Sequence, residues 1–243
     1  MPNEKRMKKL FINNIIIFVG IVAIGIALIV VSSIYVSDSN IFALILIVIM
    51  IILIVVGLIY KKRFDNLINT SYIIRIINKP GNPLPIVQLR KTESIKNILE
   101  TEDFSLHTKS QNYQLFIKVT KDMIRKVYRR YMLEVVVLIT IDNQDFYIDE
   151  VTNQINKIQD ENRRKKIRID RLIITQIKEI PSLTDKIKES IKEIIFIRTQ
   201  SQIISTINVG LDRLSQKAVF LYSDDYCPSL YYKHHIEFIK KII

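Results

Sequence analysis

Hydrophobic and polar positions divide this chain into two parts with different patterns. Leu10–Val36 and Ile41–Tyr60 are apolar runs of 27 and 20 residues that contain no Lys, Arg, Asp or Glu. A bilayer core about 30 Å thick needs about 20 helical residues, so each run predicts a transmembrane helix. Only the four residues Ser37–Asn40 separate the runs. The pattern therefore predicts a helical hairpin with a four-residue turn.

Charges at the ends of this hairpin predict its orientation. Residues 1–9 form a basic tail with four Lys or Arg and one acid, the second run is followed by Lys61-Lys62-Arg63, and the turn holds only Asp38. Because Lys and Arg beside short loops stay on the cytoplasmic side, we expect both termini in the cytoplasm of a cell membrane. The alternative is a cleaved signal peptide, whose apolar stretch is normally about 7–15 residues and thus shorter than this first run.

Small residues within the runs suggest how the helices pack. Gly20, Ala23, Ala27 and Gly57 leave room for close helix contact. We expect them to pack the two helices against each other, with a homo-oligomer contact as the alternative. The runs hold no polar residue in their interior beyond Ser32 and Ser33 near the outer end, so the hairpin predicts a tether rather than a transport pathway.

A juxtamembrane segment and a proline-rich linker, residues 61–85, follow the hairpin (10–60). Phe64–Asn78 has helical spacing and either continues the second helix or lies on the membrane. Lys79–Pro85 contains three of the six prolines, which favours an extended linker. Residues 86–243 are long enough for one compact domain.

Strand and helix patterns alternate along residues 86–243. Apolar or β-branched runs predict strands at 104–108, 113–120, 133–141, 172–177, 203–209 and 217–222. Helical spacing predicts helices at 94–100, 121–131, 148–158, 183–194 and 231–243. The order predicts an α/β domain with a mixed sheet of about five or six strands. Residues 133–141 form its central strand and pair in parallel with 172–177 through a βαβ unit.

The composition shows an excess of basic over acidic residues and predicts a reducing compartment. The chain carries 36 Lys+Arg against 24 Asp+Glu, a net charge of +12. The tail and the turn hold four of the basic and two of the acidic residues, which leaves 32 and 22 from Lys61 onward. The single cysteine, Cys227, excludes an intramolecular disulfide. Abundant Ile, Lys and Asn are typical of an AT-rich bacterial genome.

Several classes of chemistry are excluded by residues that the domain lacks. Its only glycines are Gly81 and Gly210, so neither a P-loop nor a dinucleotide-binding loop can be built. One cysteine excludes CxxC zinc sites, and the chain has no H-E-x-x-H motif. We therefore expect no cofactor and no metal site of these kinds.

Two clusters remain as catalytic hypotheses. Acids follow the central strand, where ligands bind in open α/β sheets: Asp142, Asp145, Asp149 and Glu150. The simpler interpretation is a turn followed by acids that complement a helix start. A second cluster near the C-terminus is Asp224, Asp225, Cys227, His234 and His235. A Cys–His nucleophile pair or part of a metal site competes there with an ordinary polar loop, and adjacent histidines on a helix point about 100° apart.

Two basic runs are the stronger feature. The first is Lys121, Arg125, Lys126, Arg129 and Arg130, and the second is Arg163, Arg164, Lys165, Lys166, Arg168 and Arg171. Runs of this kind most often form a solvated helix face or complement the dipole at a helix C-terminus. Binding of anionic lipid headgroups, an acidic protein or nucleic acid is the functional alternative.

These patterns favour a non-enzymatic bacterial membrane protein. Its hairpin anchors the domain in the lipid bilayer, and the basic surface binds anionic lipid headgroups or a protein partner at the inner leaflet. Nucleic acid is less favoured because the membrane already supplies an anionic surface. The alternative is a membrane-tethered metal-dependent hydrolase or nuclease that uses the acids after the central strand.

Overall fold

The computed structural model describes residues 4–86, 92–124, 130–141, 145–199 and 202–243. By their internal contacts, the residues form two compact units that divide between Ile74 and Arg75. The first unit holds the first apolar helix and all but the last four residues of the second, and the second unit holds the α/β fold.

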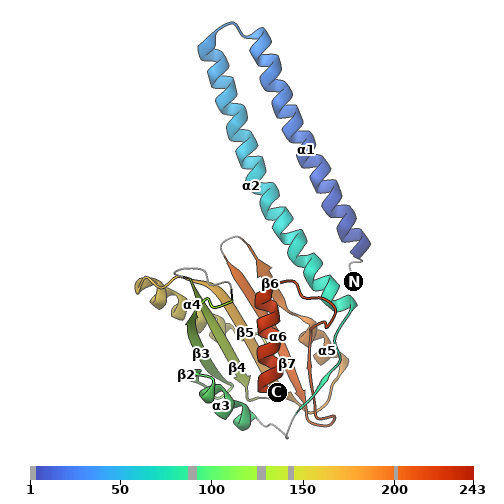
Figure 1. The fold of residues 1–243 in the computed structure, drawn as a ribbon, viewed down its shortest axis with the longest axis vertical. Coiled ribbons are helices and arrows are strands. Elements are labelled where there is room, and N and C mark those ends of the chain that lie inside the picture. The colour runs from blue at the N-terminus through green and yellow to red at the C-terminus, as the bar shows by residue number, and fades with distance from the viewer. Residues whose placement is uncertain (1–3, 87–91, 125–129, 142–144, 200–201) are drawn as a thin grey trace. The chain divides into compact units, whose positions relative to one another are not determined.

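The first unit is a hairpin of α1 (Glu4–Tyr35) and α2 (Ser39–Asn78), which lie antiparallel (Figure 1). Their connection is shorter than predicted because Asp38 caps α2. Its Oδ1 accepts the N–H groups of Asn40 at 2.8 Å and Ile41 at 3.3 Å, which places Ser39 and Asn40 in the first helical turn. Residues 64–78 continue the second helix.

The contact between α1 and α2 is made on the α1 side by residues spaced seven apart, Phe11, Phe18 and Gly25, rather than by the predicted small residues. A Cβ at Gly25 would lie 2.9 Å from Leu53 Cδ2, whereas a Cβ at Gly20 or Gly57 would meet nothing within 4 Å. Aromatic rings continue the contact at centroid distances of 5.2–6.2 Å: Phe11, Phe18, Tyr60 and Phe64. The prediction that Gly20 and Gly57 pack the helices together is therefore wrong, because Gly20 is exposed and neither glycine lies close to a side chain of the other helix.

Both helices are long and apolar enough to cross a membrane. Their large side chains are mostly exposed, as for Ile16 (63%), Leu44 (66%) and Leu58 (64%). In the most apolar 18-residue window of α2 no residue is buried. Within the described chain, α2 is thus not the core helix of a soluble domain.

The second unit is built on a mixed sheet of eight strands in the order β1-β8-β7-β5-β4-β3-β2 (Figure 1). β6 also pairs with β7, along the half of that strand that β8 leaves open. The strands are β1 (Leu84–Pro85), β2 (Ser105–Lys109), β3 (Tyr113–Lys121), β4 (Tyr131–Ile139), β5 (Ile169–Ile180), β6 (Ile195–Arg198), β7 (Ile203–Asp212) and β8 (Lys217–Phe220). The helices are α3 (Thr92–Thr101), α4 (Asp149–Arg164), α5 (Asp185–Lys192) and α6 (Leu230–Ile242).

The central βαβ unit is confirmed. β4 and β5 pair in parallel, from Tyr131 opposite Ile169 to Ile139 opposite Lys178, and α4 connects them. β5 and β7 are also parallel, whereas the other pairs are antiparallel. Residues 132–139 of β4 are all buried, as expected for a central strand covered on both faces.

Two local predictions are wrong. The helix predicted at 121–131 is absent from its described residues, because β3 and β4 pair without interruption as far as Lys121 opposite Tyr131; residues 125–129 lie outside the described residues. Backbone pairing across the sheet thus overrides the local helical pattern. The sheet also has more strands than predicted, because β1 and β6 have only two and four residues and such short strands carry little pattern.

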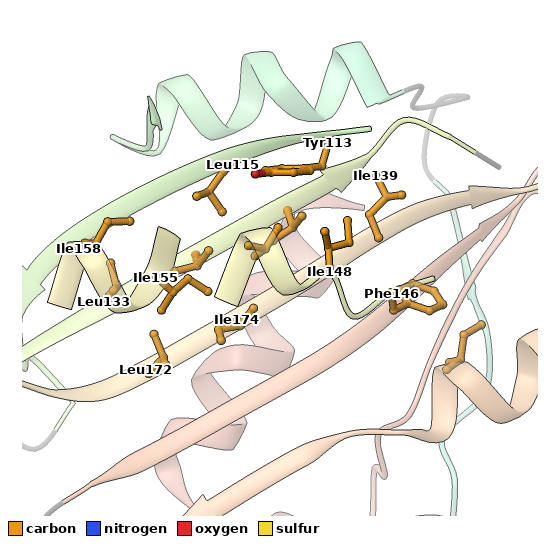
Figure 2. Close-up of a cluster of buried hydrophobic side chains, with 14 of the residues drawn as sticks. Tyr113, Leu115, Leu133, Ile139, Phe146, Ile148, Ile155, Ile158, Leu172 and Ile174 are labelled. Carbon is orange, nitrogen blue, oxygen red and sulfur yellow. The ribbon is translucent and has the colours of Figure 1, made fainter. Parts of the chain in front are cut away.

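Helices cover both faces of the sheet, and side chains alternate between them. On one face, Leu133, Val135 and Val137 of β4 pack with Ile155 and Ile158 of α4 (Figure 2). Ile191 of α5 belongs to the same apolar cluster. On the other face, α6 covers the strands (Figure 1), and its contacts there include several polar side chains.

The proline-rich stretch is held against the edge of the sheet. Gly81 N–H donates to Tyr222 O at 2.7 Å, and the Tyr222 hydroxyl donates to Asn82 O at 2.7 Å. β1 then pairs with β8, and Ile86 N–H donates to Gln216 O at 3.0 Å. Residues 81–86 are therefore part of the α/β fold rather than a free linker.

Candidate functional site

The two basic runs meet at one edge of the sheet. Tyr131 begins β4 and lies between Lys121 of β3 and Ile169 of β5. Its N–H donates to Arg168 O at 3.1 Å. The end of the first run and the end of the second run, which are 38 residues apart in sequence from Arg130 to Arg168, are thereby brought together.

Asp170 is the carboxylate that joins these runs. Its side chain is 8% exposed, and Oδ1 accepts from Arg168 Nε at 2.8 Å. Oδ2 faces Arg130 Nη1 at 3.4 Å and accepts no hydrogen bond from the described residues. The Arg168 side chain is 64% exposed, so this pair contributes at most about 1 kcal/mol to stability. Its main effect is to orient the Arg168 guanidinium, with Arg130 close to the same carboxylate.

A cleft of about 570 Å³ lies beside this pair, and we call it the basic cleft. Its lining comes from the last turns of α4 and the start of β5: Gln159, Asp160, Arg163, Lys166, Ile167, Arg168, Ile169 and Asp170. Lys166 stands just after α4 with φ of 61°. Three of the predicted anion-binding residues, Arg163, Lys166 and Arg168, therefore line one cleft.

The other predicted basic residues are placed differently. Arg164 and Lys165 are exposed at the end of α4 but are not among the residues that line the basic cleft, and Lys121 is exposed at the end of β3. Arg125, Lys126 and Arg129 lie outside the described residues.

Arg171 points to the opposite face of the sheet and is buried under α6. Its Nε lies 3.6 Å from Asp122 Oδ2, and its Cζ lies 5.1 Å from the Tyr231 ring centroid. The Tyr231 hydroxyl donates to Asp122 Oδ2. Burial is the main cause that raises the pKa of Tyr231, and the hydrogen bond to Asp122 raises it further. Since removal of one partner from a buried ion pair costs about 3–5 kcal/mol, this network is first of all a structural one.

The adjacent histidines of α6 contact different strands. His235 is fully buried between Thr175 Oγ1 at 3.0 Å and Ser205 Oγ at 2.9 Å. Burial lowers its pKa to about 3, so the ring is neutral at physiological pH. His234 Nε2 lies 2.8 Å from Glu134 Oε1. These partners were missed from the sequence, although Glu134 inside an otherwise apolar strand was a signal for a buried polar contact.

The acids after the central strand do not form a visible site. Asp142 lies outside the described residues, while Asp145, Asp149 and Glu150 are exposed. Asp149 and Glu150 stand in the first turn of α4, where they complement the helix dipole. Tyr113 has its pKa raised by burial and, to a lesser extent, by the charge of Glu150. Among the described residues, no group of three or more His, Cys, Asp or Glu could hold a metal ion.

The C-terminal cluster is dispersed among separate partners. Asp224 pairs with Lys240 and Asp225 with Lys79, each at 3.4 Å. The Cys227 thiol lies 3.1 Å from Ser229 O. Although the residue is exposed, partial desolvation of the sulfur raises its pKa. A thiol with a raised pKa is protonated at neutral pH and is a poor nucleophile.

Comparisons with known proteins do not add a family to this description. No protein-family model, curated protein or solved structure matches the chain. The basic cleft and the exposed apolar helices are therefore the features from which a function can be inferred.

Proposed function

We propose that this chain is a bacterial integral membrane protein whose hairpin anchors a non-enzymatic α/β binding domain at the inner leaflet. The observation that carries the proposal is the exposure of the apolar side chains of α1 and α2. Transfer of one such Ile or Leu out of water is worth about 1.5–3 kcal/mol. Summed over the two helices, this exceeds the roughly 5–15 kcal/mol that typically stabilises a whole domain. A signal sequence would explain α1 alone, since α2 is not N-terminal.

The orientation follows from the charges that flank the apolar runs. Basic residues stand before the apolar run of α1 and at Lys61–Arg63, while the connection between the helices holds Asp38. The positive-inside rule then places both termini in the cytoplasm. Cys227, which is exposed and is the only cysteine, supplies a natural test of this topology.

The topology is tested with a membrane-impermeant maleimide on intact cells, at mildly alkaline pH because the pKa of the Cys227 thiol is raised. We expect no labelling of the native chain until the cells are permeabilised. The matched variant carries Cys227→Ser and Ser39→Cys, and we expect it to be labelled in intact cells. Labelling of native Cys227 in intact cells would show that the domain is outside, and extraction by alkaline carbonate would contradict membrane insertion.

The partner that we propose is an anionic lipid surface, which the basic cleft contacts. A basic residue near such a surface gains about 1 kcal/mol, and Arg163, Lys166 and Arg168 are exposed together. For the full chain in nanodiscs, we expect hydrogen exchange of residues 159–170 to slow when phosphatidylglycerol is added to phosphatidylcholine. High salt should reverse the effect, since it screens exposed charges.

A charge-matched pair of variants separates the cleft from net charge. The triple variant Arg163→Gln, Lys166→Gln, Arg168→Gln should lose the protection. The control triple variant Lys186→Gln, Lys192→Gln, Lys217→Gln removes the same charge from exposed positions elsewhere and should keep it. Equal loss in both variants would mean that net charge, and not the cleft, determines binding. No observation on the described residues favours the hydrolase or nuclease alternative.

A further inference from the structure

We propose that the basic cleft binds a single phosphomonoester group, carried either by a lipid headgroup or by a small soluble molecule. This inference rests on the proposed function and names the ligand of the same surface. Binding of a single phosphomonoester differs from general attraction to an anionic leaflet. It requires a saturable site that distinguishes a phosphomonoester from a phosphodiester at equal total charge.

The charges of the cleft match such a ligand. Arg163, Lys166 and Arg168 line it together with the carboxylates of Asp160 and Asp170, and Arg130 joins through Asp170. Three cations and two carboxylates line the cleft, and Arg130, which pairs with Asp170 but does not line the cleft, raises the balance to two positive charges. A phosphomonoester carries about −1.5 to −2 at neutral pH and presents three acceptor oxygens. A phosphodiester carries less charge and fewer unesterified oxygens, so it would leave part of the cleft uncompensated.

Asp170 prepares the guanidinium groups for an oxyanion. Its bond to Arg168 uses the Nε donor, and an arginine carries its other donors on the terminal nitrogens. The Asp170 side chain is nearly buried, which restricts its motion. An arginine held in this way, as Arg168 is, can bind phosphate through parallel hydrogen bonds, which are among the strong charge-assisted kind.

The presence of a lysine at position 166 is not explained by the needs of the fold. Its N–H donates to Arg163 O at 3.0 Å and the Ile167 N–H donates to Asn162 O at 2.9 Å, which is a Schellman ending with Lys166 at the left-handed position. Glycine is the usual residue there because a side chain makes this conformation unfavourable. Helix-dipole complementation accounts for Arg163 in the last turn, but Lys166 and Arg168 lie beyond the helix.

The test uses the full chain in phosphatidylcholine nanodiscs and follows hydrogen exchange of residues 159–170. One arm adds phosphatidic acid, a second adds phosphatidylglycerol at a mole fraction that gives the same total charge, and a third adds soluble glycerol 3-phosphate to neutral discs. We expect saturable protection by a phosphomonoester at a concentration at least about tenfold lower than by the diester, as expected for one additional charge-assisted hydrogen bond.

A pair of glycine variants supplies the control. Lys166→Gly suits the left-handed backbone, so the fold should be kept while phosphomonoester affinity falls about tenfold. Gln216→Gly relieves another left-handed residue, at φ of 51°, and should leave the affinity unchanged. Equal affinities for Lys166→Gly and the native chain would overturn the assignment of the cleft.

The three arms of the experiment distinguish a lipid headgroup from a soluble ligand. They also separate failure of the phosphomonoester inference from failure of the proposed function. Protection by phosphatidic acid alone identifies a lipid headgroup, and Lys166-dependent protection by glycerol 3-phosphate identifies a soluble phosphomonoester. Equal protection by both lipids at matched charge would overturn the phosphomonoester inference and leave the proposed function standing. Protection by neither lipid would overturn the proposed lipid partner, and if glycerol 3-phosphate also gave no protection the phosphomonoester inference would be overturned as well. Competition by a single-stranded oligonucleotide at equal phosphate concentration would overturn the phosphomonoester inference in favour of nucleic acid.

Discussion

The substitution Gly81→Ala tests whether residues 81–86 are held against the α/β fold. A Cβ at this position would lie 2.8 Å from Tyr222 Cε1 and closer still to Cζ and Cε2, whereas carbon atoms prefer about 3.5–4.0 Å. The ring has little freedom to move. It is 2% exposed, stacks on Phe220 with centroids 4.7 Å apart, has Lys240 Nζ 4.6 Å from its centroid and donates its hydroxyl to Asn82 O.

The expected magnitude comes from two opposing contributions. Insertion of a methyl group into a packed site costs about 1–3 kcal/mol, and the restrained ring favours the upper half of that range. The backbone of Gly81 is not left-handed, so alanine can adopt it and gains about 0.4–1 kcal/mol through the unfolded state. We therefore expect a net loss of about 1–2.5 kcal/mol in the free energy of unfolding.

Urea unfolding of the full chain in nanodiscs, followed by circular dichroism, measures this loss. In a Tyr222→Ala background the clash is absent, so Gly81→Ala should become stabilising by about 0.4–1 kcal/mol. This reversal of sign is the sharpest part of the prediction. Equal destabilisation in both backgrounds would refute the contact with Tyr222, and Gly20→Ala, with nothing within 4 Å of its Cβ, should leave the midpoint of the α/β fold unchanged.

Three further predictions concern two buried contacts under α6 and two residues with a left-handed backbone. Arg171→Met leaves the buried Asp122 carboxylate without its guanidinium and should cost about 3–5 kcal/mol in urea unfolding, most of which Asp122→Asn in the same chain should restore. His235 is held neutral in the folded chain, with a pKa lowered to about 3, whereas in the unfolded chain the imidazole binds a proton below pH about 6.5. The free energy of unfolding should therefore fall by about 1.5 kcal/mol between pH 6.5 and 5. His235→Gln should abolish this dependence of stability on pH. Lys166→Gly and Gln216→Gly should each raise the free energy of unfolding by about 1 kcal/mol, seen as a higher midpoint of thermal unfolding. A lower midpoint for either variant would contradict the left-handed backbone.

The sequence predicted the elements whose patterns are long and regular. The hairpin and the parallel pair β4–β5 follow from apolar runs and from the spacing of Val151, Ile155 and Ile158, which all face the core. The helix predicted at 121–131 failed because pairing with a neighbouring strand decides the conformation of Lys121 and Tyr131, and that pairing joins residues ten apart. Strands as short as β1 exist only because the partner β8 is already in place.

The candidate site was predicted in composition but not in arrangement. Both basic runs were recognised, yet nothing in the sequence shows that Arg130 and Arg168 share Asp170, since this depends on the register between β4 and β5. Arg171 illustrates the opposite case. It follows Arg168 closely in sequence, but alternation along β5 sends it to the α6 face, where it pairs with Asp122.

The scarcity of glycine in the domain connects the fold to the proposed ligand. Gly81 and Gly210 are both used where a Cβ would strike a neighbour, at Tyr222 and at Ile191, and neither has a positive φ. In the described chain the left-handed positions belong instead to Asp103, Lys166 and Gln216. Backbone N–H groups are therefore not gathered into a glycine-rich phosphate cradle of the kind that nucleotide-binding loops use. The phosphate group that we propose would therefore be held by side chains, and Arg163, Lys166 and Arg168 of the basic cleft are the residues that we propose for it.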